Sequence, residues 1–204
     1  MTNESLLRLG RNDVDEIVDL LSEAFTDYPV VRFVLDPNQV QYSTQLRRFI
    51  HFFVMARVHR HEFLLGVAAA GTLQGAALVS RPWAFESSAE LDALREELWK
   101  ELGPSARARY EAFGAASTFH VPEPHLHLNL IGVRGTARGK GYGRKLLESV
   151  HAMSRDDPDS SGVSLNTETE TNVLLYRSFG YKVIGQAEVA PGLTSWGMFR
   201  PDAE

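Results

Sequence analysis

Hydrophobic residues recur at helical spacing in several stretches of the chain. Near the N-terminus, Val14, Ile17, Val18, Leu21 and Phe25 stand at the i, i+3, i+4 positions that gather on one face of an α-helix. Related patterns predict further helices over residues 45–58, from 87 or 88 to 103, over 105–113, from 142 to about 153, and over 172–179. The stretch 26–37 contains two prolines and is typical of a broken helix or a loop.

Alternating positions predict a strand over residues 125–133. Its two faces differ, because one carries only leucines and the other mostly polar side chains. The leucine face holds Leu126, Leu128 and Leu130. The opposite face holds His125, His127, Asn129 and Ile131. Other apolar or alternating runs predict strands over 6–9, 63–70, 76–79, 163–166, 181–189 and 193–199.

The order of these elements favours a mixed α/β sheet. Hairpins stand near both ends, and one strand–helix–strand crossover lies in the middle, which brings two parallel strands together. No linker interrupts the chain, so we expect a single domain over residues 1–204. Residues 84–124 are expected to form a helical insertion before the central strand.

Composition narrows the class of protein. The chain has 204 residues, 44% hydrophobic and 23% charged, as in ordinary globular proteins. Its net charge of -5 argues against a nucleic-acid partner. The absence of cysteine excludes disulfides, thiolate metal sites and a cysteine nucleophile. The N-terminus lacks a signal-peptide pattern, and no apolar run approaches the ~18 residues of a membrane span. We therefore expect a cytoplasmic protein with no membrane partner.

A basic, glycine-rich loop follows the central strand and leads into a helix. Glycine allows close approach of a ligand to the backbone, and a helix N-terminus offers unpaired N–H groups to an anion. Cations between the glycines add to the attraction. The sequence therefore predicts a phosphate-binding loop. The glycines are Gly139, Gly141 and Gly143, and the cations are Arg138, Lys140, Arg144 and Lys145.

Two common phosphate loops fit poorly. A P-loop closes with Lys and then Ser or Thr, but Lys140 is followed by Gly141. The dinucleotide fingerprint requires GxGxxG and an acidic residue at the end of a second strand. The spacing here is GxGxG, and Asp156 and Asp157 lie just past the helix.

A third pattern fits better. Gly132-Val133 at the end of a strand, followed by the Arg138–Gly143 segment, resembles the acetyl-CoA motif of GNAT-type N-acetyltransferases. A second segment, Asn172 with Tyr176-Arg177-Ser178-Phe179-Gly180-Tyr181, resembles the family's Asn…Tyr-x-x-x-Gly-Phe hallmark, with Tyr181 for the usual Phe. The mixed strand order extends the likeness over most of the chain. It ends at residues 84–124, which match no pattern.

The resemblance implies a GNAT fold, in which two parallel central strands splay apart and helices flank the sheet. It implies acetyl-CoA as co-substrate and an amine that attacks the thioester directly. The backbone of Ile131 to Val133 would pair with the pantetheine arm, and Val133 N–H would face the developing oxyanion. The expected cofactor-binding residues are Ile131, Gly132, Val133, Arg138, Gly139, Lys140, Gly141, Tyr142, Gly143, Arg144, Asn172 and Tyr176.

The resemblance also suggests catalytic residues. Tyr176 matches the family's acid tyrosine, and a phenol with a pKa of ~10 is able to protonate a departing thiolate. The alternative is a core tyrosine. His127 is a candidate for a water relay that takes the ammonium proton, although it lies ~13 Å from Ile131 along the strand. An interior histidine bonded to a neighbour is the simpler interpretation. Asn129 is a candidate for orienting water or amine.

The general base is left open. Relatives often carry Glu where Asn166 stands, and this departure weakens the case for a base on the second splayed strand. Glu168 and Glu170 are nearby alternatives, although loop carboxylates are usually exposed and solvated. The pair His125 and His127 lacks a clear third ligand, so no metal site is expected.

The acceptor is expected to be a small-molecule primary amine. Residues 28–35 and 84–124 are expected to form its pocket, because they differ most from the cofactor core. Two alternatives stay open: a non-catalytic acyl-CoA-binding sensor or partner module of the same fold, and a different phosphate-binding α/β protein. A homodimer is possible and is left open.

Overall fold

Seven strands form one sheet in the order β1-β2-β3-β4-β5-β7-β6. The computed structural model describes residues 4–84 and 87–202. All neighbouring strands pair antiparallel except β4 and β5, which are parallel. The strands are β1 (Glu4–Arg8), β2 (Phe63–Ala69), β3 (Thr72–Ser80), β4 (Leu126–Val133), β5 (Gly162–Thr167), β6 (Lys182–Ala190) and β7 (Leu193–Pro201).

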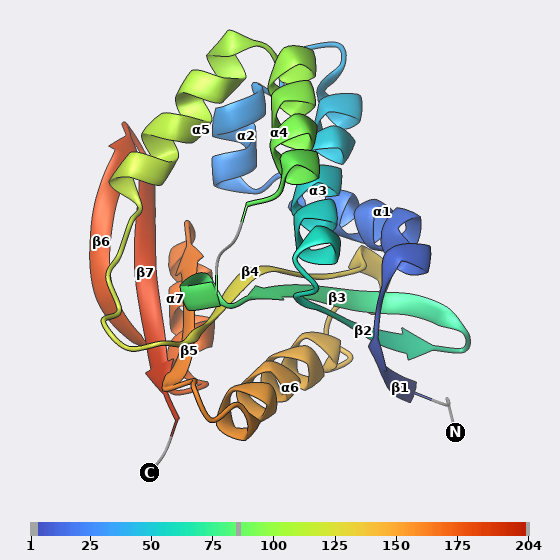
Figure 1. Ribbon diagram of the computed structural model, residues 1–204, viewed down its shortest axis with the longest axis vertical. Helices are drawn as coiled ribbons and strands as arrows, with labels where there is room; N and C mark the ends of the chain where they lie inside the picture. Colours follow the sequence, from blue (N-terminus) through green and yellow to red (C-terminus); the bar gives the residue numbers. More distant parts are fainter. Residues whose placement is uncertain (1–3, 85–86, 203–204) are drawn as a thin grey trace.

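Helices cover both faces of the sheet (Figure 1). Helices α1 to α5 lie on one side and α6 lies on the other. The helices are α1 (Val14–Phe25), α2 (Pro29–Leu35), α3 (Tyr42–His59), α4 (Ala89–Leu102), α5 (Pro104–Ala116), α6 (Tyr142–Asp156) and α7 (Glu170–Arg177). Short 3-10 turns occupy Arg11–Asp13, Pro82–Ala84 and Gly135–Ala137. The predicted mixed α/β sheet is confirmed.

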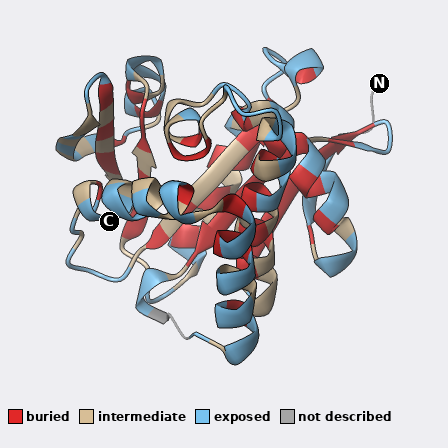
Figure 2. Cartoon of the chain, turned by 90° about the horizontal axis from the view of Figure 1, so that it is seen from above, coloured by how far each residue is buried: buried red, intermediate tan, exposed pale blue. Residues whose placement is uncertain are grey.

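Two hydrophobic cores result, one on each face. The upper core joins α1 to α5 to sheet residues such as Leu64 and Leu78. The lower core joins α6 and α7 to residues such as Leu65 and Val79 on the opposite face of the same strands. Strands β2, β3 and β5 are mostly buried, whereas β6 has no buried residue. Figure 2 shows the outward faces of the helices exposed. Residues on both faces of β2 and β3 are buried, which explains why these strands appear in the sequence as nearly continuous apolar runs.

The central parallel strands pair over only part of their length. Leu126, His127 and Leu128 of β4 stand opposite Val163, Ser164 and Leu165 of β5. Beyond Leu128, β4 continues to Val133 and β5 to Thr167 without pairing to each other. The strands therefore diverge towards their carboxyl ends, as the family resemblance implied. The gap leaves backbone groups of the central strands available to a ligand.

A β-bulge in β4 corrects the predicted alternation. On β3, Leu78 pairs with Leu130 but the next residue, Val79, pairs with Leu128, so Asn129 is the extra residue. Leu130 therefore packs against the upper core, whereas Leu126, Leu128 and Ile131 pack in the lower core. The prediction that Leu130 shares a face with Leu126 and that Ile131 shares one with His127 is wrong. One inserted residue reverses the side of every residue after it.

The stretch 26–37 also differs from its prediction, because it contains a regular helix. Pro29 occupies the first turn of α2, where the missing N–H is harmless. The helix ends at Asp36, whose φ of +54° breaks the helical path. Elsewhere the predicted helices and strands are confirmed within a few residues at their ends. The helix predicted from residue 87 or 88 begins after Ser88, whose hydroxyl accepts a hydrogen bond from Leu91 N–H.

The segment after α5 is held against the last hairpin by Phe119. Its ring lies over Gly185 of β6 and Gly197 of β7. A Cβ added at Gly197 would approach the ring to 2.3 Å, and one at Gly185 to 2.6 Å. The absence of side chains at the two glycines leaves room for the ring. This contact joins residues 117–125 to the far edge of the sheet.

Replacing Gly197 with Ala is expected to lower the free energy of unfolding by about 1–3 kcal/mol, because the new methyl group would displace the Phe119 ring. Gly114→Ala is the matched control. Gly114 lies in α5, where an added Cβ would meet no atom within 4 Å, so alanine there should stabilise the helix by up to about 1 kcal/mol. Chemical denaturation of both variants tests this. Equal stabilities for the two alanine variants would contradict a close contact between the Phe119 ring and Gly197.

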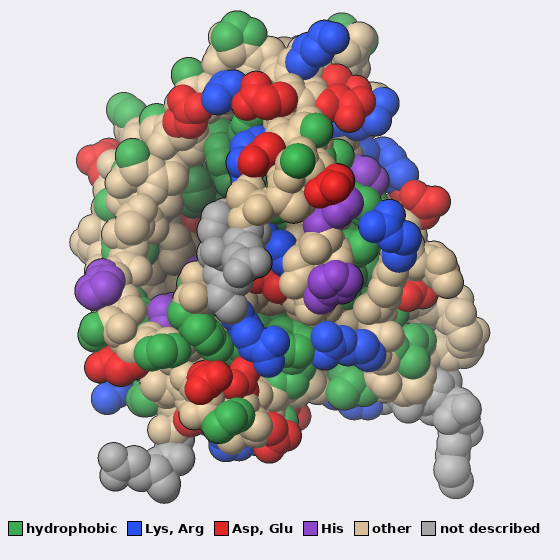
Figure 3. Space-filling model, in the orientation of Figure 1, with side chains coloured by type: hydrophobic (Ala, Val, Ile, Leu, Met, Phe, Trp, Pro, Cys, Tyr) green, Lys and Arg blue, Asp and Glu red, His purple; other side chains and the backbone are tan. Residues whose placement is uncertain are grey.

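The surface carries mixed charge. Basic and acidic side chains are interspersed on the face drawn in Figure 3. Among the described residues, no helix has both the length and the apolar character required to cross a bilayer.

Candidate active site

A cavity of about 700 Å³ lies beside the glycine-rich loop. We call it the loop cavity; it is bounded by the end of β4, residues 137–144, the start of α6, α7 and the end of α1. Every residue predicted to bind the cofactor lines it except Lys140, which is exposed. Motifs that are ~40 residues apart in the sequence therefore converge on one space.

The loop has the backbone geometry that its glycines allow. Gly139 and Gly141 have φ values of +77° and +85°, in the region that other residues rarely adopt. Gly141 is the N-cap of α6, so the free N–H groups and the positive end of this helix face the loop. A Cβ at either glycine would meet no protein atom within 4 Å, so the space above the loop is open. This arrangement suits a pyrophosphate.

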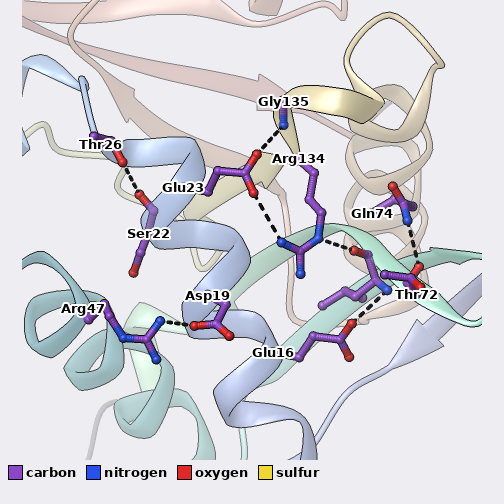
Figure 4. A network of polar contacts seen from close by, with 11 residues as sticks. Glu16, Asp19, Ser22, Glu23, Thr26, Arg47, Thr72, Gln74, Arg134 and Gly135 are labelled. Atoms are coloured by element: carbon purple, nitrogen blue, oxygen red, sulfur yellow. Dashed lines mark hydrogen bonds and ion pairs between the residues drawn. The ribbon is translucent and has the colours of Figure 1, made fainter. Parts of the chain in front are cut away.

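Helix α1 anchors the start of the loop (Figure 4). The Glu23 carboxylate accepts hydrogen bonds from Gly135 N–H at 2.7 Å and from Arg134 Nη1 at 3.2 Å. Arg134 Nε also donates to Leu73 O at 2.9 Å, and Leu73 N–H donates to Glu16 Oε1 at 3.0 Å. The Arg134 guanidinium therefore binds groups of the protein itself, the Glu23 carboxylate and Leu73 O. Sequence reasoning missed this network, because Glu23 and Arg134 are 111 positions apart.

A second cavity of about 260 Å³ lies between the diverging strands and the helices above them. We call it the inner cavity. Its walls come from α1, α2, α3, α5, β4 and β5, with Glu168 and α7 at one end. The prediction that residues 28–35 and 84–124 line a pocket is supported by Tyr28 and by Tyr110 of α5. Phe49 and Phe53 of α3 also line this cavity, which was not predicted from the sequence.

The two cavities meet. Five residues line both: Phe25, Tyr28, Ile131, Asn172 and Tyr176. A ligand in the loop cavity and a ligand in the inner cavity would therefore be in reach of each other at this junction. Tyr28 comes from the loop before α2 and Tyr176 from α7, so the junction joins distant parts of the chain.

Tyr176 is largely buried at the junction, with 8% of its surface exposed. Burial raises the pKa of its phenol, and the nearby charge of Glu168 raises it further. The phenol is therefore protonated at neutral pH. Its hydroxyl has no hydrogen-bond partner among the described residues. Its ring packs on Tyr181, with centroids 5.5 Å apart.

His127 lines the inner cavity from β4 and is partly buried. Its Nδ1 lies 2.7 Å from Ser164 Oγ on β5. Burial lowers its pKa to about 4, with smaller contributions from His125 and Arg57. The imidazole is therefore neutral at pH 7. The Nδ1 of His125 lies 2.7 Å from the backbone oxygen of Glu123.

The two asparagines flanking the gap have different environments. Asn129, the bulge residue, lines the inner cavity, and its Oδ1 is buried without a hydrogen-bond partner among the described residues. Asn166 on β5 donates from Nδ2 to Ser117 O at 2.8 Å, which fastens the segment after α5 to the site.

The burial of Glu168 is the largest difference between the site and its prediction. The residue was expected to be exposed, yet only 8% of its surface is accessible. Ser195 Oγ of β7 donates to Glu168 Oε1 at 2.8 Å, and the Tyr28 hydroxyl accepts from Glu168 N–H at 3.2 Å. Burial raises the pKa of Glu168, and the hydrogen bond from Ser195 partly offsets this. Glu170, two residues on, is exposed as expected.

Comparison with known proteins agrees with this geometry. Residues 67–199 match the family described as "Acetyltransferase (GNAT) domain". Among solved structures, the chain resembles histone acetyltransferase HPA2 and related acetyltransferase from Corynebacterium glutamicum, with 23% identity over 100% of this chain and 98% of that chain and a TM-score of 0.74. The polyamine N-acetyltransferase of Drosophila melanogaster shares 16% identity over 97% and 98%, with a TM-score of 0.60. An agmatine N-acetyltransferase shares 14% over 98% and 99%, with a TM-score of 0.59.

Proposed function

The chain belongs to the GNAT acetyltransferase family, and we propose that it transfers the acetyl group of acetyl-CoA to the nitrogen of a small primary amine. The observation that carries this proposal is the meeting of the two cavities at Tyr28 and Tyr176. One cavity is lined by the basic, glycine-rich loop and the other mostly by apolar and aromatic side chains of the helices. A donor and an acceptor bound on the two sides would meet where β4 and β5 diverge.

The loop cavity is proposed to hold acetyl-CoA. Backbone N–H groups of Gly139 and of residues 141–144 at the N-terminus of α6 would bind its pyrophosphate, aided by the side chains of Arg138 and Arg144. The backbone of Ile131 to Val133, which is unpaired on the β5 side, would bind the pantetheine arm. Lys140 is exposed, so its contribution would be to the charge around the loop.

Tyr176 is proposed as the acid that protonates the departing thiolate. It lines both cavities, remains protonated at neutral pH and has a hydroxyl without a partner among the described residues. His127 and Asn129 line the inner cavity, where they are proposed to order water or the acceptor. With a pKa of about 4, His127 is too weak a base to hold a proton at pH 7, so its proposed part is limited to a relay.

An amine acceptor is supported by the similar proteins that act on amines. Their names describe a polyamine N-acetyltransferase that forms N-acetylagmatine and an agmatine N-acetyltransferase. The inner cavity is slightly smaller than the ~300–1,000 Å³ of most ligand pockets, which favours a small molecule over a peptide.

Thiol release from acetyl-CoA is expected only when an amine is added. A colorimetric thiol assay over a panel of amines, amino acids, aminoglycosides and lysine peptides tests this, with the amine-free reaction as control. At least one small amine should give a turnover of roughly 1–1,000 per second. Thiol release no faster than the amine-free rate across the whole panel would contradict the proposed reaction. A thermal shift with ATP or NAD but none with acetyl-CoA would contradict the proposal that acetyl-CoA is the donor.

A further inference from the structure

Glu168 is a buried carboxylate without a cationic partner. Of the described residues that line the inner cavity, none is Lys or Arg, and His127 is neutral at pH 7. No ion pair involves Glu168 within the described part of the chain. Burying a carboxylate is costly unless it is paired. The Ser195 hydroxyl donates a hydrogen bond to the carboxylate but supplies no positive charge.

The position of Glu168 suits an acceptor better than a donor. It lines the inner cavity but not the loop cavity, whereas Tyr176 lines both. Glu168 lies close enough to Tyr28 and Tyr176 for its charge to raise the pKa of both phenols. The carboxylate is therefore on the acceptor side, next to the point where the two cavities meet.

A second hydrogen-bond acceptor faces the same space. Asn129 also lines the inner cavity, and its buried Oδ1 has no donor among the described residues. A buried oxygen without a donor calls for a ligand or water that supplies one. A primary ammonium carries three N–H donors and one positive charge, so it is able to supply a donor to an acceptor oxygen in this cavity and a charge to the carboxylate.

Most of the other residues that line the inner cavity are apolar or aromatic; the exceptions are His127, Asn166 and Asn172. Its walls carry aromatic rings from three helices, including Phe25, Phe49, Tyr110 and Phe113, together with Leu130. A second cationic group on the acceptor would have no carboxylate to pair with there. The walls therefore favour a compact hydrocarbon or aromatic body over a polyamine or an aminoglycoside.

We propose that Glu168 binds the ammonium of the acceptor and takes a proton from it, and that the acceptor is a primary monoamine with a compact apolar or aromatic body. This inference rests on the proposed acetyl transfer. The ammonium gives one proton to the Glu168 carboxylate and becomes the neutral amine. Its nitrogen forms a bond to the acetyl carbon as the carbon–sulfur bond breaks. The thiolate takes the Tyr176 proton, and the second nitrogen proton, lost as the amide forms, restores the phenol.

Amine binding tests the inference separately from turnover. Isothermal titration with 2-phenylethylamine, in the presence of CoA, is expected to show binding to the wild-type chain. Glu168→Gln keeps the shape and the Ser195 contact but removes the charge, so it should weaken binding roughly 30- to 1,000-fold. Glu170→Gln is the matched control, because this carboxylate is exposed and lines neither cavity; its affinity should stay within about twofold.

Comparisons on the wild-type chain keep the inference testable even where Glu168→Gln fails to fold. The neutral analogue 2-phenylethanol and the dication agmatine should each bind at least about tenfold more weakly than 2-phenylethylamine, a difference of ~1.4 kcal/mol. Equal affinity for the alcohol would overturn the role of the carboxylate, and preference for agmatine would overturn the acceptor class. Unchanged affinity in Glu168→Gln would also overturn the role of Glu168.

Kinetics separate this inference from the proposed function. When wild type releases thiol, Glu168→Gln should lower kcat/KM for 2-phenylethylamine by about 10²–10⁴-fold and leave acetyl-CoA affinity unchanged. Thiol release that is undiminished in this variant would overturn the proton-acceptor role. When wild type releases no thiol with any amine, the proposed function fails, and the titrations above still decide whether Glu168 binds the ammonium.

Discussion

Replacing Gly141 with Val is expected to weaken acetyl-CoA binding by more than about 100-fold, which corresponds to ~2.8 kcal/mol. Gly141 has a φ of +85° and caps α6 at the loop. A β-branched residue is strained in this conformation, so the loop must change its path. Its side chain would also fill the open space above the loop. Backbone N–H groups would then lose their hydrogen bonds to phosphate, each worth ~1.5–3 kcal/mol when the partner is charged.

Gly71→Val is the matched control for this substitution. Gly71 has a φ of +77° in the turn between β2 and β3, also with no atom within 4 Å of an added Cβ, and it lines neither cavity. Both variants should lose similar stability, but only Gly141→Val should lose affinity. Isothermal titration with acetyl-CoA and thermal melting of both variants measure the difference. Equal affinities in the two variants would show that the loop does not bind the pyrophosphate.

Replacing Tyr176 with Phe is expected to lower kcat by about 10²–10⁴-fold, the range for loss of a general acid. The aromatic ring remains and continues to pack on Tyr181, so the walls of both cavities should keep their shape. The affinity for acetyl-CoA should therefore change little. Single-turnover thiol release, combined with titration of acetyl-CoA, separates these two effects.

Tyr181→Phe is a control within the same aromatic cluster. The Tyr181 hydroxyl lies 3.0 Å from His151 Nε2 and lines neither cavity. Removing it should cost stability, because a buried hydrogen bond is lost, but kcat should be retained. A similar fall in kcat for both variants would point to packing of the cluster in place of proton transfer by Tyr176.

Local patterns were sufficient to predict much of the fold. The spacing of Val14 to Phe25 located α1, and the glycines between Arg138 and Arg144 located the loop and the start of α6. These features depend on residues close together in the sequence, where periodicity and helix caps act directly. The convergence of the loop with Asn172 and Tyr176 was expected only through the family resemblance.

The features that the sequence did not predict depend on contacts between residues far apart in the chain. The bulge at Asn129 exists because β4 pairs with β3 in a shifted register, which alternation within β4 does not reveal. The burial of Glu168 depends on Ser195, 27 positions later, and on Tyr28, 140 positions earlier. The position of Glu168 just after a predicted strand was visible, but its sequence neighbours are polar and indicated an exposed loop.

The way β4 runs along both cavities has a consequence for protein engineering. Residues His127 to Leu130 line only the inner cavity, Gly132 and Val133 line only the loop cavity, and Ile131 lines both. A library that varies positions 127–130 would therefore reshape the space for one ligand and leave the wall of the other intact. Because the wall passes from one cavity to the other at Ile131, the two halves of β4 are open to independent redesign.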